Sequence, residues 1–370
     1  HLEPPGPRFG PGSTLYFVSA GAEANPYGDG AVYELEFGVS GGVMMPVEDA
    51  SPSGALTSSY LRRDEHEENH LYQATLSEAE EPWMWDMLFA PAKKGYGFSV
   101  SALAPVTEPS RLELGLQGGS DFLESPDHHV AIYINQTLVA ERSWDGKLPQ
   151  ELNVELGPGV LREGANLLEV ENVGDTGAAY SMVYLDRFAV TYPRLPSAEG
   201  GRLEGRWTES GTAEVSGVSS GASLVDTTRA QPVWLSGTSS SGDNVLRFLA
   251  EAAHDYLVVD ASQIKNPEVR KASRAWLKRT SNQADTIVIG PKAFLDAAGP
   301  LVEHRRRQGL LPLAVPVVEI YSEFGFGEPR PEAIRAFLSY AYHHWKAPSL
   351  RYVLLLGDAT YDFKNDYGLN

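Results

Sequence analysis

The hydrophobic pattern of this 370-residue chain changes near residue 250, and the change indicates two fold classes in one polypeptide. Before that point, short runs rich in Val, Tyr, Phe and Leu are separated by Gly, Pro, Asn and Asp turns. After it, strand-like apolar runs alternate with helix-like segments. Turn-separated strands are typical of antiparallel sheets, whereas strand–helix alternation is typical of a parallel sheet. We therefore predict a multidomain protein in which antiparallel β-sandwich modules precede a parallel α/β domain.

The β part contains six runs that we expect to form strands. They cover residues 13–19, 31–37, 111–117, 129–135, 151–156 and 167–171. Residues 130–134 alternate between two faces, as a half-buried strand does. We expect an N-terminal β segment over residues 1–82, a jelly-roll-like sandwich over 83–194 and a small β subdomain or linker over 195–249, in which residues 211–218 and 222–226 are strand-like.

The α/β part is expected to occupy residues 250–370. Its expected strands are 256–259, 285–290, 313–318 and 352–356, and its expected helices are 267–279, 291–308 and one that begins at Pro331. Gly309 stands where a C-terminal capping glycine belongs. The run 352–356 is unbroken and apolar, which is typical of a strand buried on both faces. The third helix carries an apolar stripe at helical spacing, made of Ile334, Phe337, Leu338, Ala341 and Trp345.

Charge and cysteine usage narrow the classes of function. The chain has 30 Lys and Arg against 49 Asp and Glu, a net charge of −19, which disfavours nucleic-acid binding. No apolar run reaches the length of about 18 residues that spans a bilayer. There is no cysteine, so these residues hold no disulfide, thiolate metal site or cysteine nucleophile. The chain begins at His1 rather than Met, and we expect a processed or partial sequence.

Ligands of open parallel sheets gather beyond the carboxyl ends of the strands. The residues there are Gly290, the segment 319–327 and Gly357-Asp358. Three more oxygen donors follow Asp358, namely Asp362, Asn365 and Asp366, and calcium takes six to eight oxygen ligands. This spacing suggests a calcium site. The alternative is an ordinary polar loop in which Asp362 and Asn365 stabilise turns.

Two histidine motifs have a weaker claim to function. His66-Glu67-Glu68-Asn69-His70 matches the H-E-x-x-H helix of zinc peptidases, in which His66 and His70 would bind zinc and Glu67 would act as base. The neighbouring charged residues favour a solvated acidic loop instead. Asp127-His128-His129 begins an expected strand, so its side chains point to opposite faces and a structural role at the sandwich rim is favoured.

The α/β segment resembles the gingipain-type cysteine peptidase family. The match runs in order through residues 284–290, 300–310, 319–325, 331–338 and 352–362, and the last of these, Tyr352-Val-Leu-Leu-Leu-Gly-Asp-Ala-Thr-Tyr-Asp362, is the most specific. Residues 127–130, 183–188 and 192–194 resemble the β modules that precede this domain in large exported members. The resemblance implies a caspase-like catalytic domain with a His–Cys pair. It also implies calcium binding, with Asp358 as a candidate ligand.

In that family the catalytic histidine and cysteine lie on strands beyond the Gly-Asp strand, so neither is assigned to a residue of this chain. We expect the N-terminal portion of an exported cysteine endopeptidase, extracellular or at a bacterial cell surface, with a truncated α/β domain. Its partners would be protein or peptide substrates and an export machinery, and no organic cofactor is expected. The alternatives are a β-module binding or adhesion protein with a degenerate peptidase-like domain, and a zinc peptidase that uses His66 and His70.

Overall fold

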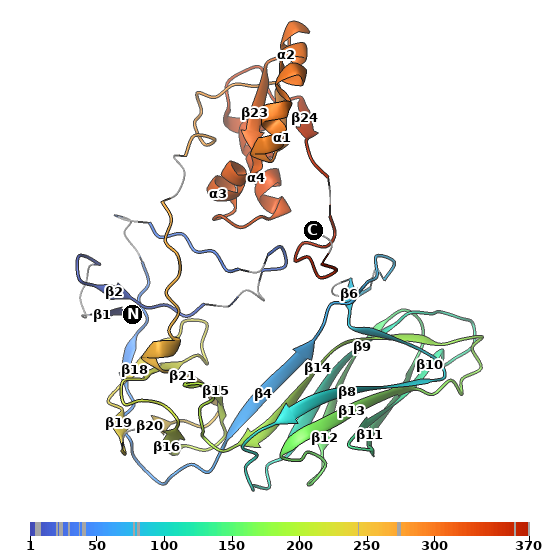
Figure 1. Cartoon of the computed structure of the whole chain (residues 1–370), viewed down its shortest axis with the longest axis vertical. Helices are drawn as coiled ribbons and strands as arrows, with labels where there is room; N and C mark the ends of the chain where they lie inside the picture. Colours follow the sequence, from blue (N-terminus) through green and yellow to red (C-terminus); the bar gives the residue numbers. More distant parts are fainter. Residues whose placement is uncertain are drawn as a thin grey trace. The chain divides into compact units, whose positions relative to one another are not determined.

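The computed structural model describes residues 1–3, 9–19, 21, 25–28, 30–36, 38, 42–76, 78–79, 82–242, 244–271, 275–358 and 360–368. The chain divides into two compact units (Figure 1). The first, here called the β unit, comprises His1–Tyr16 and Met44–Lys265. The second, here called the α/β unit, comprises Phe17–Val43 and Asn266–Asn370.

One part of the β unit is a two-layer sandwich (Figure 1). One antiparallel layer has the order β11 (Thr137–Trp144), β10 (His128–Ile134), β13 (Gly164–Asn172), β8 (Ala92–Val100). The other contains β12 (Pro149–Leu156), β9 (Ser110–Gly118), β14 (Met182–Arg194) and β4 (Tyr60–Glu67), again antiparallel. Val130, Ile132 and Ile134 are fully buried in the shared core, as the alternating pattern predicted.

A second β core lies beyond β4. The sheet continues in the order β15 (Arg202–Trp207), β21 (His254–Val259), β17 (Ser223–Asp226), β18 (Val233–Ser236), β3 (Val47–Asp49). It packs on a three-stranded sheet of β16 (Gly211–Ser216), β20 (Val245–Ala250) and β19 (Ser239–Ser240). Tyr60 and Trp207 stack in this core with ring centroids 5.0 Å apart.

The run 256–259 therefore differs from its expected place at the start of the α/β domain. As part of β21 it is antiparallel to both β15 and β17, so its hydrogen bonds are made inside the β unit. The division between the two units falls after Lys265 rather than near residue 250. An apolar run indicates a strand but not the strands with which it pairs.

The remaining strands of the β unit are short. They are β1 (Leu2–Glu3) with β2 (Thr14–Leu15), the hairpin of β5 (Leu71–Tyr72) with β6 (Trp83–Met84), and β7 (Asp86–Phe89), which pairs with β14. Of the expected strand 13–19, only Thr14–Leu15 is a strand. The expected strand 31–37 is wrong for residues 31–36, which have no regular secondary structure, and Phe37 lies outside the described residues.

The α/β unit contains a parallel sheet, as predicted, in the order β23 (Pro312–Pro316), β22 (Thr286–Gly290), β24 (Tyr352–Leu355). Its helices are α1 (Lys292–Ala297), α2 (Gly299–Arg307), α3 (Val317–Phe324) and α4 (Pro331–His344) (Figure 1). α4 begins at Pro331, and its apolar stripe packs on the sheet core, which confirms that part of the prediction. Gly309 has a φ of 83° just after α2, as a C-terminal cap requires.

Three expectations for this unit are wrong. Residues 267–271 and 275–279 are not helical, although Pro267 to Arg279 was expected to be a helix, and 272–274 lie outside the described residues. The expected helix 291–308 is two helices that meet at Ala298, before Gly299-Pro300. The expected strand 313–318 ends at Pro316, because α3 begins at Val317.

The strand β24 is exposed rather than buried on both faces. Its four side chains are between 38% and 64% exposed, whereas every residue of the central strand β22 is buried. It lies at the edge of the sheet, with β22 as its only neighbour among the described strands, and, unlike the other edge strand β23, none of its four residues belongs to the core of the α/β unit. None of the helices in the described part of the chain is long and apolar enough to cross a membrane.

Candidate functional site

The carboxyl ends of the three parallel strands meet at one edge of the α/β unit. β22 ends at Gly290, β23 at Pro316 and β24 at Leu355, as expected for the ligand-binding edge of such a sheet. The backbone N–H of Leu356 donates to the carbonyl oxygen of Ile289 over 2.7 Å. A Cβ at Gly290 would lie 2.4 Å from the carbonyl oxygen of Leu356, so only glycine allows this close approach.

The loop after β24 is organised around Asp362. Asp362 is buried, with its Oδ1 accepting from the backbone N–H of Asp366 at 2.6 Å and its Oδ2 from that of Tyr367 at 3.0 Å. Asp358, by contrast, is exposed. Both Asp362 oxygens thus serve the loop, which is the turn role weighed for this residue from sequence.

The acidic side chains of α3 hold a neighbouring segment in place. Glu323 Oε1 accepts from the backbone N–H groups of Trp276 and Leu277 over 2.8 and 3.0 Å. Glu319 Oε2 accepts from the indole N–H of Trp276. The segment 319–327 was expected to supply ligand-binding groups, but these two carboxylates are engaged by the chain itself.

A hollow of about 520 Å³ opens beside the start of α4. The residues that line it include Phe324, Phe326, Arg330 and Arg335. Phe326 is 67% exposed and has a φ of 55°, in the left-handed region. The sequence had indicated only a Gly/Pro turn here, because the hollow depends on how that turn lies against α4.

The zinc-peptidase interpretation of His66 and His70 is wrong. His66 lies on β4, not on a helix, and its ring stacks on Phe188 with centroids 4.7 Å apart. Burial lowers the pKa of His66. His70 lies beyond the end of β4 and pairs with Glu68 at 3.0 Å. Four residues of extended chain span about 13 Å, whereas one helical turn would have brought both imidazoles to one metal ion.

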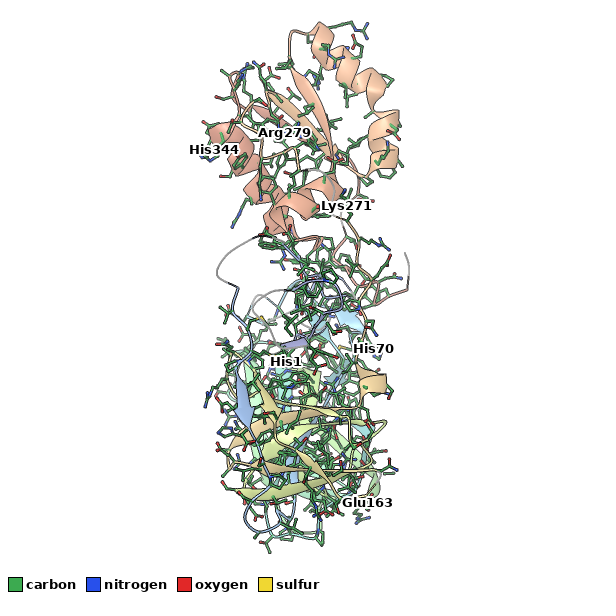
Figure 2. The ribbon with its side chains drawn as sticks, turned by 90° about the vertical axis from the view of Figure 1, so that its left-hand side faces the viewer. His1, His70, Glu163, Lys271, Arg279 and His344 are labelled. Atoms are coloured by element: carbon green, nitrogen blue, oxygen red, sulfur yellow. The ribbon has the colours of Figure 1, made fainter. Side chains whose placement is uncertain are left out.

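The solvated acidic loop expected instead is found only over residues 68–70, where Glu68 and His70 are exposed, because Asp64 to Glu67 belong to strand β4. Among the described residues, no group of three or more His, Asp or Glu side chains is arranged to hold a metal ion. His70 and Glu163 lie at opposite ends of the β unit, whereas Arg279 and His344 belong to the α/β unit (Figure 2).

The motif Asp127-His128-His129 has the structural role predicted for it. His128 is fully buried, and its Nδ1 lies 2.8 Å from the Ser181 hydroxyl. Burial lowers the pKa of His128, because the charged imidazolium is poorly solvated there. His129 points elsewhere and pairs with Asp175 at 2.7 Å. The two imidazoles therefore do not converge on one ligand.

One histidine–carboxylate pair was not found from the sequence. His254 Nδ1 lies 2.6 Å from Asp226 Oδ2, and His254 Nε2 lies 3.3 Å from Glu251. Asp226 and His254 stand on the neighbouring strands β17 and β21 but are 28 residues apart in sequence. No local motif marks such a pair, since only the strand register brings it together.

Residues 279–370 match the model of peptidase family C25. This confirms the resemblance to gingipain-type cysteine peptidases over most of the α/β unit. No curated protein sequence matches the chain.

Among solved structures, dimeric latent PorU from Porphyromonas gingivalis is similar, with a TM-score of 0.64 and 17% sequence identity. The match covers 87% of this chain but 32% of PorU, so the chain spans about a third of that protein. At this identity the likeness supports the fold, which is β modules followed by an α/β domain. The CBM36-1 domain of a xylanase from the hindgut metagenome of Trinervitermes trinervoides also matches, over 35% of this chain and 95% of its own, at 14% identity and a TM-score of 0.23.

Proposed function

We propose that this chain is the N-terminal portion of an exported gingipain-like cysteine endopeptidase with a caspase-like catalytic domain. One observation carries the proposal: the family C25 match at residues 279–370 coincides with the parallel sheet β23-β22-β24 and its helices. The similarity to the fold of PorU supports the same arrangement of β modules before an α/β domain.

The chemistry would be attack of a thiolate on a peptide carbonyl, with an imidazole that handles the proton. The 370 residues contain no cysteine, so the nucleophile would come from a residue outside this sequence. The carboxyl edge at Gly290, Pro316 and Leu355 is where added strands of the sheet would bring such groups. The 370-residue chain would then supply the framework of the site and no catalytic residue.

The proposed setting is extracellular or at a bacterial cell surface, reached through an export machinery, with proteins or peptides as substrates. The net charge of −19 supports a role away from nucleic acid, because it repels phosphate backbones.

A comparison of two polypeptides tests the proposal. The purified 370-residue chain should not cleave a mixture of fluorogenic peptides, whereas a product of the longer open reading frame should cleave them and lose activity with iodoacetamide. Thiol-independent cleavage by the chain alone would contradict the proposal. A longer product without thiol-dependent cleavage would favour a β-module binding or adhesion protein instead.

We also propose Asp358 as a calcium ligand, because its carboxylate follows β24 at the carboxyl edge. The described residues around it do not form a complete site, since Asp362 uses both oxygens within the loop. Further oxygen ligands would have to come from elsewhere. Calcium titration monitored by the thermal unfolding midpoint tests the assignment. A midpoint that rises equally in the chain and in Asp358→Asn would exclude Asp358 as a ligand.

A further inference from the structure

A short turn near the N-terminus belongs to the α/β unit, although the chain before and after it belongs to the β unit. The β unit comprises His1–Tyr16 and Met44–Lys265, and the α/β unit comprises Phe17–Val43 and Asn266–Asn370. The segment 17–43 is therefore joined to the β unit at both ends while it forms one compact unit with residues 266–370. Within this segment the structure describes residues 25–28 and 30, here called the N-terminal turn.

Asn25 organises the N-terminal turn from within. The residue is 4% exposed, and its Nδ2 donates to the carbonyl oxygen of Gly30 over 2.9 Å. Its Oδ1 accepts from the backbone N–H of Tyr27 at 3.0 Å. Asparagine side chains that bond to nearby backbone in this way stabilise turns. The turn therefore holds the backbone of Tyr27 in a defined position.

The ring of Tyr27 packs on the loop that follows β24. Its centroid lies 5.0 Å from that of Phe363, and the two ring planes are 78° apart. Aromatic pairs favour this edge-to-face arrangement. Phe363 follows Asp362, whose oxygens accept from the backbone N–H groups of Asp366 and Tyr367. Tyr27 therefore meets a loop whose backbone is itself held by hydrogen bonds.

Two more contacts involve the connection between α3 and α4. A Cβ at Gly28 would lie 3.9 Å from Cγ of Pro329, so the backbone of the turn runs close to this proline. Gly327 has a φ of 91°, and a Cβ there would lie 2.9 Å from Cγ1 of Val32, just beyond the turn. Only glycine suits such a conformation and such an approach. Gly327, Pro329 and Phe363 thus form the surface that receives the turn.

The distribution of charge along the chain favours the same docking. Residues 266–370 contain 14 Lys and Arg against 11 Asp and Glu, whereas residues 1–265 contain 16 against 38. The segment 17–43 contains four Asp and Glu and no Lys or Arg. An acidic segment is attracted to a part of the chain with net positive charge. Charge therefore adds to the packing contacts of the turn.

The covalent connection between the two units is an exposed linker. Residues 266–271 have no regular secondary structure and all are exposed, Val269 to 81%. Exposed irregular segments are preferred sites of proteolytic cleavage. A cut in this linker would leave residues 266–370 without a covalent bond to the rest of the chain, so that only noncovalent contacts would retain them.

We propose that docking of the N-terminal turn on Gly327, Pro329 and Phe363 holds residues 266–370 to the rest of the chain when the linker is cut. The cut protein stays a complex of two polypeptides, and the ring of Tyr27 is the main contact between them. This role concerns the contacts of the chain with itself and does not depend on the proposed peptidase function.

A cut at a chosen place in the purified 370-residue chain tests the proposal. A recognition sequence for a sequence-specific protease is inserted between Lys265 and Asn266, and the cut protein is analysed by size-exclusion chromatography over a dilution series. The two polypeptides should elute together. Tyr27→Ala should raise their dissociation constant by about tenfold or more. Tyr27→Phe keeps the ring and should leave the dissociation constant unchanged.

The matched control is Tyr33→Ala in the same segment. The ring of Tyr33 packs on Phe17, with centroids 5.0 Å apart, so its loss should leave the association unchanged. Circular dichroism of each uncut variant checks folding, and Val32→Asp, which alters the contact with Gly327, stands as a second test and should also weaken the association. Separation of the unsubstituted polypeptides after the cut, an equal loss in Tyr27→Ala and Tyr33→Ala, or no loss in either Tyr27→Ala or Val32→Asp would each overturn the proposal.

Discussion

Asp226 is a carboxylate held by several partners within the second β core. Its Oδ2 lies 2.6 Å from His254 Nδ1, and its Oδ1 accepts from the backbone N–H of Thr228 at 2.9 Å. Burial on its own would raise the pKa of Asp226, but the hydrogen bonds from Thr228 and the interaction with His254 outweigh it. The pKa of Asp226 therefore lies below its ordinary value of 3.8.

The lowered pKa of Asp226 makes the stability of the folded chain depend on pH. A carboxyl whose folded pKa lies below its unfolded pKa contributes its full stability above the unfolded value and loses it as pH falls through the folded value. Asp226→Asn should lower the free energy of unfolding by roughly 1–3 kcal/mol at pH 7, and by less below pH 3.8. Urea denaturation at both pH values measures the effect. Glu204→Gln, in an exposed pair with Arg202, is the control and should change little. A loss in Asp226→Asn that grows as pH falls would contradict the assignment.

Gly118 is a position in β9 that accepts no side chain. A Cβ there would lie 2.2 Å from the carbonyl oxygen of Gly146 and 3.0 Å from both His128 Nε2 and Trp144 Nε1. Gly118→Ala should destabilise the chain by roughly 1–3 kcal/mol, because the Gly146 backbone would have to shift to make room for the added methyl group. Gly97→Ala, in β8, would meet nothing within 4 Å and should be neutral or stabilising. Equal unfolding free energies for the two variants would show that the contact at Gly118 relaxes freely.

At the scale of elements, β24 exposes apolar side chains at the edge of the parallel sheet. Leu355 is 64% exposed and Tyr352 is 49% exposed. Exposed apolar strand edges bind hydrophobic dyes and promote association. The 370-residue chain should therefore enhance the fluorescence of such a dye, and Leu355→Lys should reduce the enhancement.

The control for β24 is Val269→Lys. Val269 is 81% exposed in an irregular segment, and single exposed apolar residues do not form a dye site. Unchanged dye fluorescence in Leu355→Lys, or an equal decrease in Val269→Lys, would place the apolar surface elsewhere.

At the scale of the whole molecule, the two units have separate cores. Leu114 is fully buried in the sandwich core, and Phe337 is fully buried in the core of the α/β unit. Because no core residue in the described part of the chain is shared between the two units, we expect two thermal transitions. Phe337→Ala should lower the midpoint of one and Leu114→Ala that of the other, each through a loss of roughly 2–5 kcal/mol. Calorimetry measures both. A single transition that both substitutions lower would mean that the units unfold together.

Local signals explain which elements could be predicted. Strand β10 followed from alternation along Val130 to Ile134, and α4 from Pro331 and a stripe of apolar residues. α3 was missed because Val317, Val318 and Ile320 favour a strand locally. In the structure this segment is a helix. It buries Ile320, and its Glu323 accepts hydrogen bonds from the backbone N–H groups of Trp276 and Leu277. Tertiary contacts override local propensity at such places.

The sequence by itself determined the two fold classes, the sandwich strands β9, β10, β12 and β13, and the resemblance of the α/β segment to gingipain-type cysteine peptidases, because periodicity and ordered motifs are properties of the chain alone. Only the tertiary structure decided that β21 belongs to the β unit, that β24 is an exposed edge and that His66 lies on a strand. It alone placed His254 beside Asp226 on neighbouring strands. Each of these depends on which strands pair and in which register, and pairing joins residues that no local pattern connects.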